Sequence, residues 1–538
     1  MHAVRKVRSS VIAALAAIAW TAAAAAPLKA AAPTPAPVNV LTFHNDNMRS
    51  GHNRGETILK VSNVNSATFG KLFSYPVDGY LYAEPLYVSQ LAIAGQGTHN
   101  VVFAATEHDS VYAFDADGLT PTPLWQASFI DPANGITTVN ATDVQCDNLV
   151  PEIGITGTPV ISLENQALYV VSEAKDQNTG SYLMELHALD LATGEEKPGS
   201  PVSISATVNG TGLGNDGHGH VSFVPQLALQ RPALLLANGM IYIAFASNCD
   251  RGDYHGWVLA YDALTLVQRA AFNTTPNGSE GGIWQSGNGP SASQFGDVFV
   301  GIGNGTFNGK TDYGDSFVKL DPMLRVVDYF TPSDQATLSA NDDDGGITGA
   351  VLLPPQTLGP ATLEVMGGIK SGRFYLLRRS SMGRFCATCN DSQAIGVLET
   401  GFPLFDAPAY AFGFVYLGGV GARLKAWPII NGRLSASAAA RSATAFGYPG
   451  ASIAISSDGS VRRIVWALDE SGYGNSLPAV LHAYWAPDLS ERYNSAQAGS
   501  RDTAGPAVKF AVPTVANGKV YVGTQTELDV YGPLPTAR

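Results

Sequence analysis

One short pattern, a strand that ends in Asp, recurs along this chain and limits the folds that it can adopt. Four copies match one another closely: YAFD (112–115), HALD (187–190), LAYD (259–262) and VKLD (318–321). Four weaker copies follow: YLLR (375–378), LKAW (424–427), LHAY (481–484) and LDVY (528–531). Most copies come after another β-rich run and before a further short strand. The unit is therefore four strands, and it occurs about eight times.

A four-stranded unit repeated in this way predicts a β-propeller, in which each blade packs on its two neighbours and the core grows around a ring. The last unit, 519–532, stops before its outer strand, whereas 69–77 is a strand without a unit of its own. We therefore expect an all-β, eight-bladed propeller of four-stranded blades, closed by an N-terminal strand that completes the last blade. Closure of this kind removes two exposed strand edges. The low share of charged residues, 14%, with 57 Gly, suits an all-β chain.

The N-terminus reads as a targeting segment. Arg5, Lys6 and Arg8 precede an Ala-rich apolar stretch with several Ala-x-Ala cleavage options. We assign 1–32 to a signal peptide with an Ala/Pro-rich leader and 40–538 to a single propeller domain; a membrane anchor is the alternative for the leader. The mature chain is then expected to be exported, periplasmic or extracellular, monomeric, and without a membrane span.

The formal charge argues against nucleic acid as a partner. Residues 1–32 carry four basic residues and no acidic ones, so their removal takes the charge from −13 to −17. Such a surface repels phosphate backbones. The expected partners are a small molecule, a glycan or an envelope protein.

Four cysteines, an even number in an exported chain, suggest disulfides. The simplest pairing joins Cys146 to Cys249 and Cys386 to Cys389. A zinc site of four thiolates and a redox-active Cys386–Cys389 pair are the alternatives. The CATC sequence is followed by Asn390 and lacks the His that covalent haem attachment requires.

Several stretches resemble a known family. VYAFDADG followed by PLWQ, and VYVGTQTELDVYG near the C-terminus, are similar to the repeats of the pyrroloquinoline quinone (PQQ)-type propellers. FHNDNMRSGHN, VPEIGITGTPVI, EGGIWQSGNGP and DYGDSFVKLD resemble the exported bacterial quinoprotein alcohol dehydrogenase-like proteins, over nearly all of 40–538. The resemblance implies PQQ over the channel, with calcium polarising the quinone and a carboxylate base. Known members hold two adjacent cysteines against the cofactor, and this chain has none adjacent.

Polar residues at strand ends are the candidates for a site at one mouth of the channel. Glu107, His108 and Asp109 interrupt the first repeat and do not recur with it. The candidate catalytic residues are Glu107, His108, Asp109, Asp253 and His255. The candidate cofactor-binding residues are Trp284 and Gln285, in an unusual Gly-rich context, and Lys370 and Arg373, against the quinone oxygens. No metal ligand is assigned. His44, Asp46 and Arg49 precede the first strand and are expected to cap one face.

Three functions are compatible with this pattern. The first is an exported binding or scaffold protein with a ligand site at one channel mouth, which needs no cofactor. The second is a PQQ- and calcium-dependent oxidoreductase of alcohols or sugars. The third is a cofactor-independent polysaccharide lyase or hydrolase that pairs His108 with Glu107, or His255 with Asp253. Whether the chain is an enzyme stays open at this point.

Overall fold

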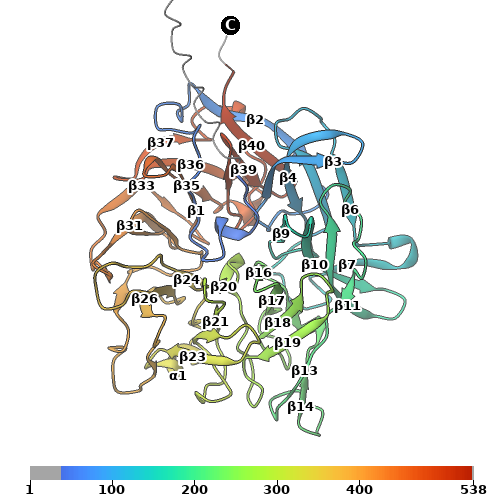
Figure 1. Cartoon of the computed structure of the whole chain (residues 1–538), viewed down its shortest axis with the longest axis vertical. Helices are drawn as coiled ribbons and strands as arrows, with labels where there is room; N and C mark the ends of the chain where they lie inside the picture. The colour runs from blue at the N-terminus through green and yellow to red at the C-terminus, as the bar shows by residue number, and fades with distance from the viewer. Residues whose placement is uncertain (1–37, 536–538) are drawn as a thin grey trace, which may run out of the picture. The chain divides into compact units, whose positions relative to one another are not determined.

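A computed structural model describes residues 38–535, so the predicted leader at 1–32 lies outside the described residues. Within this range the strands form nine sheets, eight of which follow one another around a ring, as Figure 1 shows. The predicted eight-bladed, all-β propeller is confirmed. Helix is limited to α1 (Gln335–Ala340) and a few single turns among the described residues. No helix there is long and apolar enough to cross a membrane.

The blades are numbered in chain order, and the first four occupy the N-terminal half. Blade 1 holds β3 (Leu86–Ile93), β4 (Gly97–Ala105), β5 (Ser110–Asp115) and β6 (Trp125–Ser128). Blade 2 holds β7 (Ile136–Asn140), β8 (Glu152–Ile153), β9 (Val160–Ser162), β10 (Ala167–Asp176), β11 (Ser181–Asp190) and β12 (Val202–Ser203). Blade 3 holds β15 (Ala228–Leu229), β16 (Leu235–Ala237), β17 (Met240–Ser247), β18 (Trp257–Asp262) and β19 (Gln268–Asn273). Blade 4 holds β20 (Ser291–Ala292), β21 (Val298–Gly301), β22 (Phe317–Leu320), β23 (Val326–Thr331) and β27 (Arg384–Phe385).

The other four blades complete the ring. Blade 5 holds β24 (Val351–Leu352), β25 (Glu364–Gly368), β26 (Arg373–Arg378) and β28 (Gly396–Glu399). Blade 6 holds β29 (Ala409–Ala411), β30 (Phe414–Leu417), β31 (Ala422–Ile430), β32 (Arg433–Leu434) and β33 (Ala440–Phe446). Blade 7 holds β34 (Ala451–Asp458), β35 (Val461–Asp469), β36 (Val480–Trp485) and β37 (Ser490–Asn494), with β1 (His52–Asn53) beside β34. Blade 8 holds β38 (Thr514–Ala516), β39 (Lys519–Gly523), β40 (Glu527–Pro533) and β2 (Phe69–Pro76).

The structure refines the predicted number of strands per blade and confirms the predicted ring closure. Only blades 1, 5 and 8 are four-stranded, because the other blades carry one or two short extra strands; β1 adds to blade 7, and β27, from a connection within blade 5, adds to blade 4. The predicted closure is present, since β2 pairs antiparallel with β40 and completes the last blade. A separate hairpin of β13 (Thr207–Asn209) and β14 (His220–Ser222) stands outside the blades.

The Asp that ends the recurring strand forms hydrogen bonds within the turn that follows it. The Oδ1 atom of Asp115 accepts the backbone N–H groups of Asp117 and Leu119, at 2.8 and 3.2 Å. The Oδ1 atom of Asp262 likewise accepts from Leu264 and Thr265, at 3.1 and 3.0 Å. Each carboxylate thus holds the turn that leads into the outer strand of its blade.

The core lies between neighbouring blades, which is why the middle strands read as unbroken apolar runs. Side chains alternate across a strand, so β17 presents Ile241 and Ile243 to blade 2 and Tyr242 and Ala244 to blade 4. All four side chains are fully buried. Both faces of a blade must therefore be apolar, and each blade depends on its two neighbours.

The segment 40–53 runs through the middle of the ring, drawn in blue in Figure 1, and bonds to every blade in turn. We call it the hub. Its hydrogen bonds are Val40 with Tyr87 of blade 1, Leu41 with Ile161 of blade 2, Asn47 with Leu236 of blade 3, Asn47 with Ala292 of blade 4, Met48 with Leu352 of blade 5, Ser50 with Tyr410 of blade 6, Gly51 with Ile455 of blade 7 and Asn53 with Val515 of blade 8.

Arg49 lies at the centre of the hub and is fully buried. Its guanidinium donates to the carbonyl oxygens of Leu234, Pro290 and Phe43, each at 3.0 Å, and to the Thr42 hydroxyl at 2.7 Å. Burial lowers the pKa of Arg49 to about 10, which still leaves it charged at neutral pH. A single side chain therefore ties the hub to blades 3 and 4.

Replacement of Arg49 should destabilise the ring. Arg49→Met leaves four buried acceptors without a donor, and we expect the free energy of unfolding to fall by at least about 2 kcal/mol. The matched control is Arg54→Met, because Arg54 is exposed five residues further on; its effect should stay within about 0.5 kcal/mol. Urea unfolding followed by tryptophan fluorescence measures both. Equal effects of the two variants would contradict the assigned role of Arg49.

Candidate functional site

A cavity of about 200 Å³ lies at one mouth of the ring. Its lining comes from blades 2 to 8 and consists of Asn148, Leu149, Leu229, Arg231, Cys249, Asp250, Trp284, Ser286, Asp342, Asp344, Ile347, Lys370, Phe405, Tyr448, Lys509 and Phe510. Most of these residues sit in loops that lead into the innermost strand of a blade. The hub bonds to these innermost strands themselves. The cavity is therefore formed by the loops at one end of the strands, and the hub contacts the strands further along.

Arg231 is the most unusual residue of the cavity. It is only 4% exposed, and neither of its terminal nitrogens has a hydrogen-bond partner among residues 38–535. The guanidinium lies 5.2 Å from the centre of the Phe510 ring and 5.5 Å from that of the Tyr82 ring. Both aromatic faces favour a cation there. The two rings nevertheless leave the N–H groups of Nη1 and Nη2 without hydrogen-bond acceptors.

Three buried carboxyl groups lie near Arg231 without forming an ion pair with it in the described part of the chain. Burial raises the pKa of Glu107 to about 7. Burial also raises the pKa of Asp406 and of Glu470 above the ordinary range, and the charge of Asp406 adds to the shift at Glu470. Near neutral pH, Glu107 and Asp406 are therefore only partly ionised, and they compensate the charge of Arg231 only in part.

Two lysines add to the positive character of the cavity in different ways. The Nζ atom of Lys370 lies 2.6 Å from an oxygen of Asp342 and 3.5 Å from one of Asp344, so its charge is already paired. Lys509 is 6% exposed and donates to the Oδ1 atom of Asn148 at 2.7 Å, with no carboxylate in contact among the described residues. Burial, followed by the charge of Arg231, lowers the pKa of Lys509 to about 8.

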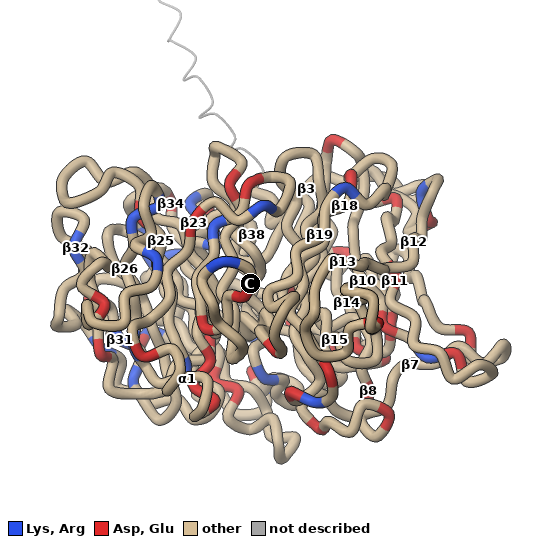
Figure 2. The backbone as a smooth tube through the Cα atoms, turned by 90° about the horizontal axis from the view of Figure 1, so that it is seen from below, with Lys and Arg blue, Asp and Glu red and all other residues tan. Residues whose placement is uncertain are grey.

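The acidic residues on the Lys370 side follow α1, where Figure 2 shows them in red. Burial raises the pKa of Asp344 to about 7. Asp250, on the neighbouring wall, accepts hydrogen bonds from the Tyr254 hydroxyl at 2.6 Å and the Ser247 hydroxyl at 3.0 Å. The carboxylates of the lining are thus engaged with protein donors. Across residues 38–535, no group of three or more His, Cys, Asp and Glu side chains is placed to hold a metal ion.

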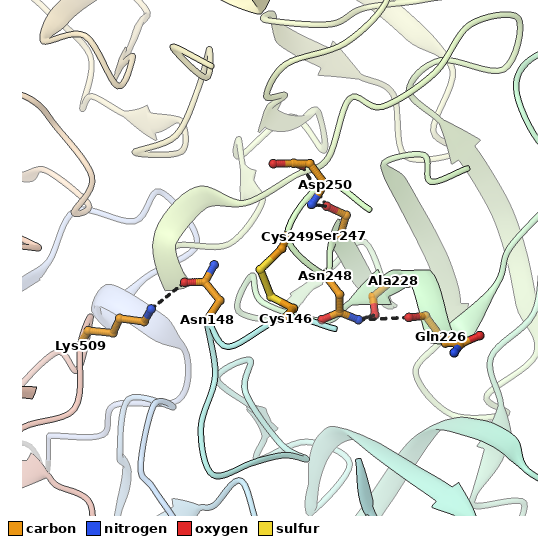
Figure 3. The surroundings of a disulfide bond; sticks show 9 residues. All are labelled: Cys146, Asn148, Gln226, Ala228, Ser247, Asn248, Cys249, Asp250 and Lys509. Carbon is orange, nitrogen blue, oxygen red and sulfur yellow. Dashed lines mark hydrogen bonds between the residues drawn. A yellow bond between two sulfur atoms is a disulfide. The ribbon is translucent and has the colours of Figure 1, made fainter. Parts of the chain in front are cut away.

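A disulfide forms part of the cavity wall. Cys146 and Cys249 are bonded, which joins the connection between β7 and β8 to the end of β17 (Figure 3). Next to it, the Asn248 amide donates to the backbone carbonyl of Ala228 at 3.2 Å, and Asn148 reaches Lys509. The second disulfide joins Cys386 to Cys389, so the pairing expected from the sequence is confirmed.

Of the nine residues proposed from the sequence, Trp284 and Lys370 line this cavity. Gln285 is fully buried next to Trp284, where its Oε1 atom accepts the backbone N–H of Gly301 at 3.1 Å. Arg373 is outside the lining and is paired with Asp334 at 2.6 Å and Asp391 at 3.4 Å. Neither residue lines the cavity, although the Nε2 atom of Gln285 has no hydrogen-bond partner within residues 38–535.

Glu107, His108 and Asp109 form the tight turn between β4 and β5. Glu107 is fully buried, and its Oε2 atom accepts the Gly154 N–H at 2.8 Å and the Thr156 hydroxyl at 3.0 Å, which joins blade 1 to blade 2. His108 contacts Glu152 at 2.9 Å rather than the Glu107 with which the sequence reading paired it. Asp109 is buried with φ 52°. The three side chains therefore point in different directions, and none lines the cavity.

Asp253 and His255, in the connection between β17 and β18, are outside the lining of this cavity. They line a recess of about 10 Å³, which has no room for a sugar. Both ring nitrogens of His255 are engaged, with the Thr275 hydroxyl at 2.9 Å and the Leu213 carbonyl at 2.8 Å. This geometry gives no support to an acid–base pair made of these two residues.

The comparisons with known proteins concern the fold. No protein-family model and no curated protein matches the sequence. A quinohaemoprotein alcohol dehydrogenase from Pseudomonas putida HK5 matches with a TM-score of 0.60 and 15% identity, over 93% of this chain and 81% of that one. Its counterpart from Comamonas testosteroni matches with a TM-score of 0.58 and 16% identity, over 95% and 82%.

A europium-containing methanol dehydrogenase also matches, with a TM-score of 0.56 and 12% identity, over 92% of this chain and 98% of that one. At identities this low the likeness shows the fold alone. The chain thus shares the propeller fold of these proteins, and the site must be judged on its own residues.

The protonation of Glu107 predicts a pH dependence of stability. Because the pKa is raised to about 7 in the folded state, stability is full below the ordinary carboxyl pKa and falls as the pH rises through about 7. Glu107→Gln mimics the protonated form. We expect the variant to be more stable than the wild type at pH 8, by on the order of 3 kcal/mol, and the difference to vanish near pH 4.5.

Urea unfolding at several pH values measures this difference. The control is Glu399→Gln, because Glu399 is exposed on β28 and should show no such dependence. A Glu107→Gln effect that does not change with pH would contradict the assigned protonation.

Proposed function

We propose that this chain is an exported binding protein that holds a small organic acid in the cavity at the mouth of the ring. The observation that carries the proposal is Arg231, a buried guanidinium whose two terminal nitrogens have no partner within residues 38–535. A buried, unpaired charge costs several kcal/mol. A carboxylate that accepts from both nitrogens would remove most of this cost, because Arg matches that geometry bidentately.

The walls support an acid with a planar apolar body. Trp284, Phe405, Tyr448 and Phe510 line the cavity next to the Cys146–Cys249 disulfide. The volume of about 200 Å³ is below the roughly 300–1,000 Å³ of sites for drug-sized ligands, so the occupant is small. Lys509 places a second positive charge in the same lining. The cavity therefore combines aromatic packing with convergent cations.

Calorimetry with a charged and an uncharged ligand tests the proposal. We expect 3-phenylpropionate to bind the wild-type chain at least about tenfold more tightly than 3-phenylpropanamide, since a charge-assisted hydrogen bond contributes about 1.5–3 kcal/mol. Arg231→Gln should remove this preference, and Arg231→Lys should keep part of it. The matched control is Arg325→Gln, because the Arg325 side chain is 81% exposed and lies outside the lining. Equal affinity for acid and amide, or an unchanged preference in Arg231→Gln, would overturn the proposal.

PQQ-dependent oxidation of an alcohol or sugar is the second candidate. The coincidence of a disulfide, Trp284 and three cations in one lining favours it, together with the fold. The residues fit the full cofactor site only in part. The disulfide does not join adjacent cysteines, and the lining carboxylates Asp342, Asp344 and Asp250 already hold protein donors, which leaves no ready ligand set for calcium. We derive no reaction step through this cofactor.

Titration with PQQ separates the two candidates. If the site holds a small acid alone, PQQ should bind weakly, and calcium in excess should not change its affinity. Quinone absorbance and the shift of the melting temperature are the measurements. Saturable binding that depends on calcium would instead favour the oxidoreductase.

A further inference from the structure

We infer that the acid held at Arg231 also carries a carbonyl group, which Lys509 captures as an imine; this inference rests on the proposed function. The ligand class is then a carbonyl acid, such as a 2-oxo acid with an aromatic side chain.

Lys509 and Arg231 are neighbours in the cavity. Phe510, the next residue along the chain, places its ring 5.2 Å from the Arg231 guanidinium, and Lys509 itself lines the same cavity. The backbone N–H of Phe510 donates to the Oε2 atom of Glu470 at 2.5 Å, which fixes this loop before β38. A molecule whose carboxylate sits at Arg231 therefore shares the cavity with the Lys509 amine.

Lys509 differs from the other shielded lysines of residues 38–535. Five partly buried lysines, with side chains that are 14–24% exposed, contact a carboxylate: Lys71, Lys175, Lys319, Lys370 and Lys519. The half-buried Lys425 lies instead over the rings of Phe402 and Trp427. Lys509 is more buried, at 6% exposure, yet its Nζ atom contacts only the Asn148 amide oxygen and lies 5.4 Å from the centre of the Tyr473 ring. No ion pair is therefore lost when this amine reacts.

The charges around Lys509 favour its neutral form more than those around a surface lysine do. Burial and the positive charge of Arg231 lower its pKa to about 8, while Asp147 acts in the opposite direction. A desolvated amine next to another cation is a recognised way to obtain a nucleophilic lysine near neutral pH.

The proposed step is a condensation that balances without an oxidant or reductant. The lone pair of the neutral Lys509 amine attacks the carbonyl carbon of the acid. The two hydrogens of the amine leave with the carbonyl oxygen as water, and a carbon–nitrogen double bond replaces the carbon–oxygen double bond. The carboxylate stays at Arg231, and hydrolysis reverses the step.

Reductive trapping tests the inference. The mature chain is incubated with phenylpyruvate and sodium borohydride, which reduces an imine to a stable secondary amine. Peptide mapping by mass spectrometry should find the adduct on Lys509, with at least ten times more adduct there than on any other lysine. The yield should increase as the pH rises through about 8.

Two variants and one ligand serve as controls. Lys509→Arg keeps the positive charge and should lower the yield at least tenfold, whereas Lys519→Arg, in an ion pair with Asp117 on the outside of the cavity, should not change it. 3-Phenylpropionate, which has no carbonyl group beyond its carboxylate, should bind and give no adduct.

The outcomes separate this inference from the proposed function. If phenylpyruvate and 3-phenylpropionate bind in an Arg231-dependent way and no adduct forms on Lys509, the carbonyl inference is overturned and acid binding stands. An adduct spread over surface lysines also overturns it. If neither acid binds, both proposals fail.

Discussion

The hydrogen bonds between the hub and the innermost strands hold the rest of the structure in place. A propeller blade packs on two neighbours only, so blades on opposite sides of the ring share no core. The hub changes this, because residues 40–53 bond to all eight blades in order. The hub also fills the middle of the ring, and its hydrogen bonds to the blades give its own backbone partners there. Arg49 supplies four of these bonds from one buried side chain.

The buried arginines of the hub and of the mouth cavity differ in their hydrogen bonds. Arg49 and Arg231 are both almost fully buried, at 0% and 4% exposure. Arg49 finds an acceptor for each of its donor groups, and its charge is spread over carbonyl oxygens of the fold. Arg231 lies over the rings of Tyr82 and Phe510 and has no acceptor for its terminal nitrogens within residues 38–535. A cation that the protein itself leaves unsatisfied is a strong reason to look for a ligand.

The fold could be read from the sequence because its signals are local and repeated. The recurring strand, which ends in Asp in four of its eight copies, marks the blades, and the isolated strand at 69–77 indicates the closure that β2 and β40 form. The two disulfides also followed from the count and spacing of the cysteines. The hub was anticipated only in part, since His44, Asp46 and Arg49 were expected to cap one face and instead belong to a segment inside the ring.

The site was harder to predict because its residues belong to different blades and come together only when the ring closes. Arg231, Tyr448 and Lys509 stand alone in irregular loops, and no spacing relates them. Their shared signal is their place just before an innermost strand, which is visible once the strands are ordered. Glu107 was selected from the sequence on a different ground. It is a polar residue that the repeat does not require, but its carboxyl group joins blades 1 and 2 through Gly154 and Thr156 and does not face the cavity.

The proposal that Arg231 makes the mouth cavity an acid-binding site can be tested by crystallography. A crystal of the protein is grown with 3-(4-bromophenyl)propionate, and anomalous data are collected at the bromine edge. We expect one bromine peak among Trp284, Tyr448 and Phe510, with the carboxylate bonded to both terminal nitrogens of Arg231. A bromine found only elsewhere on the protein, or an Arg231 guanidinium paired with Glu107 or Asp406 in an empty cavity, would contradict it.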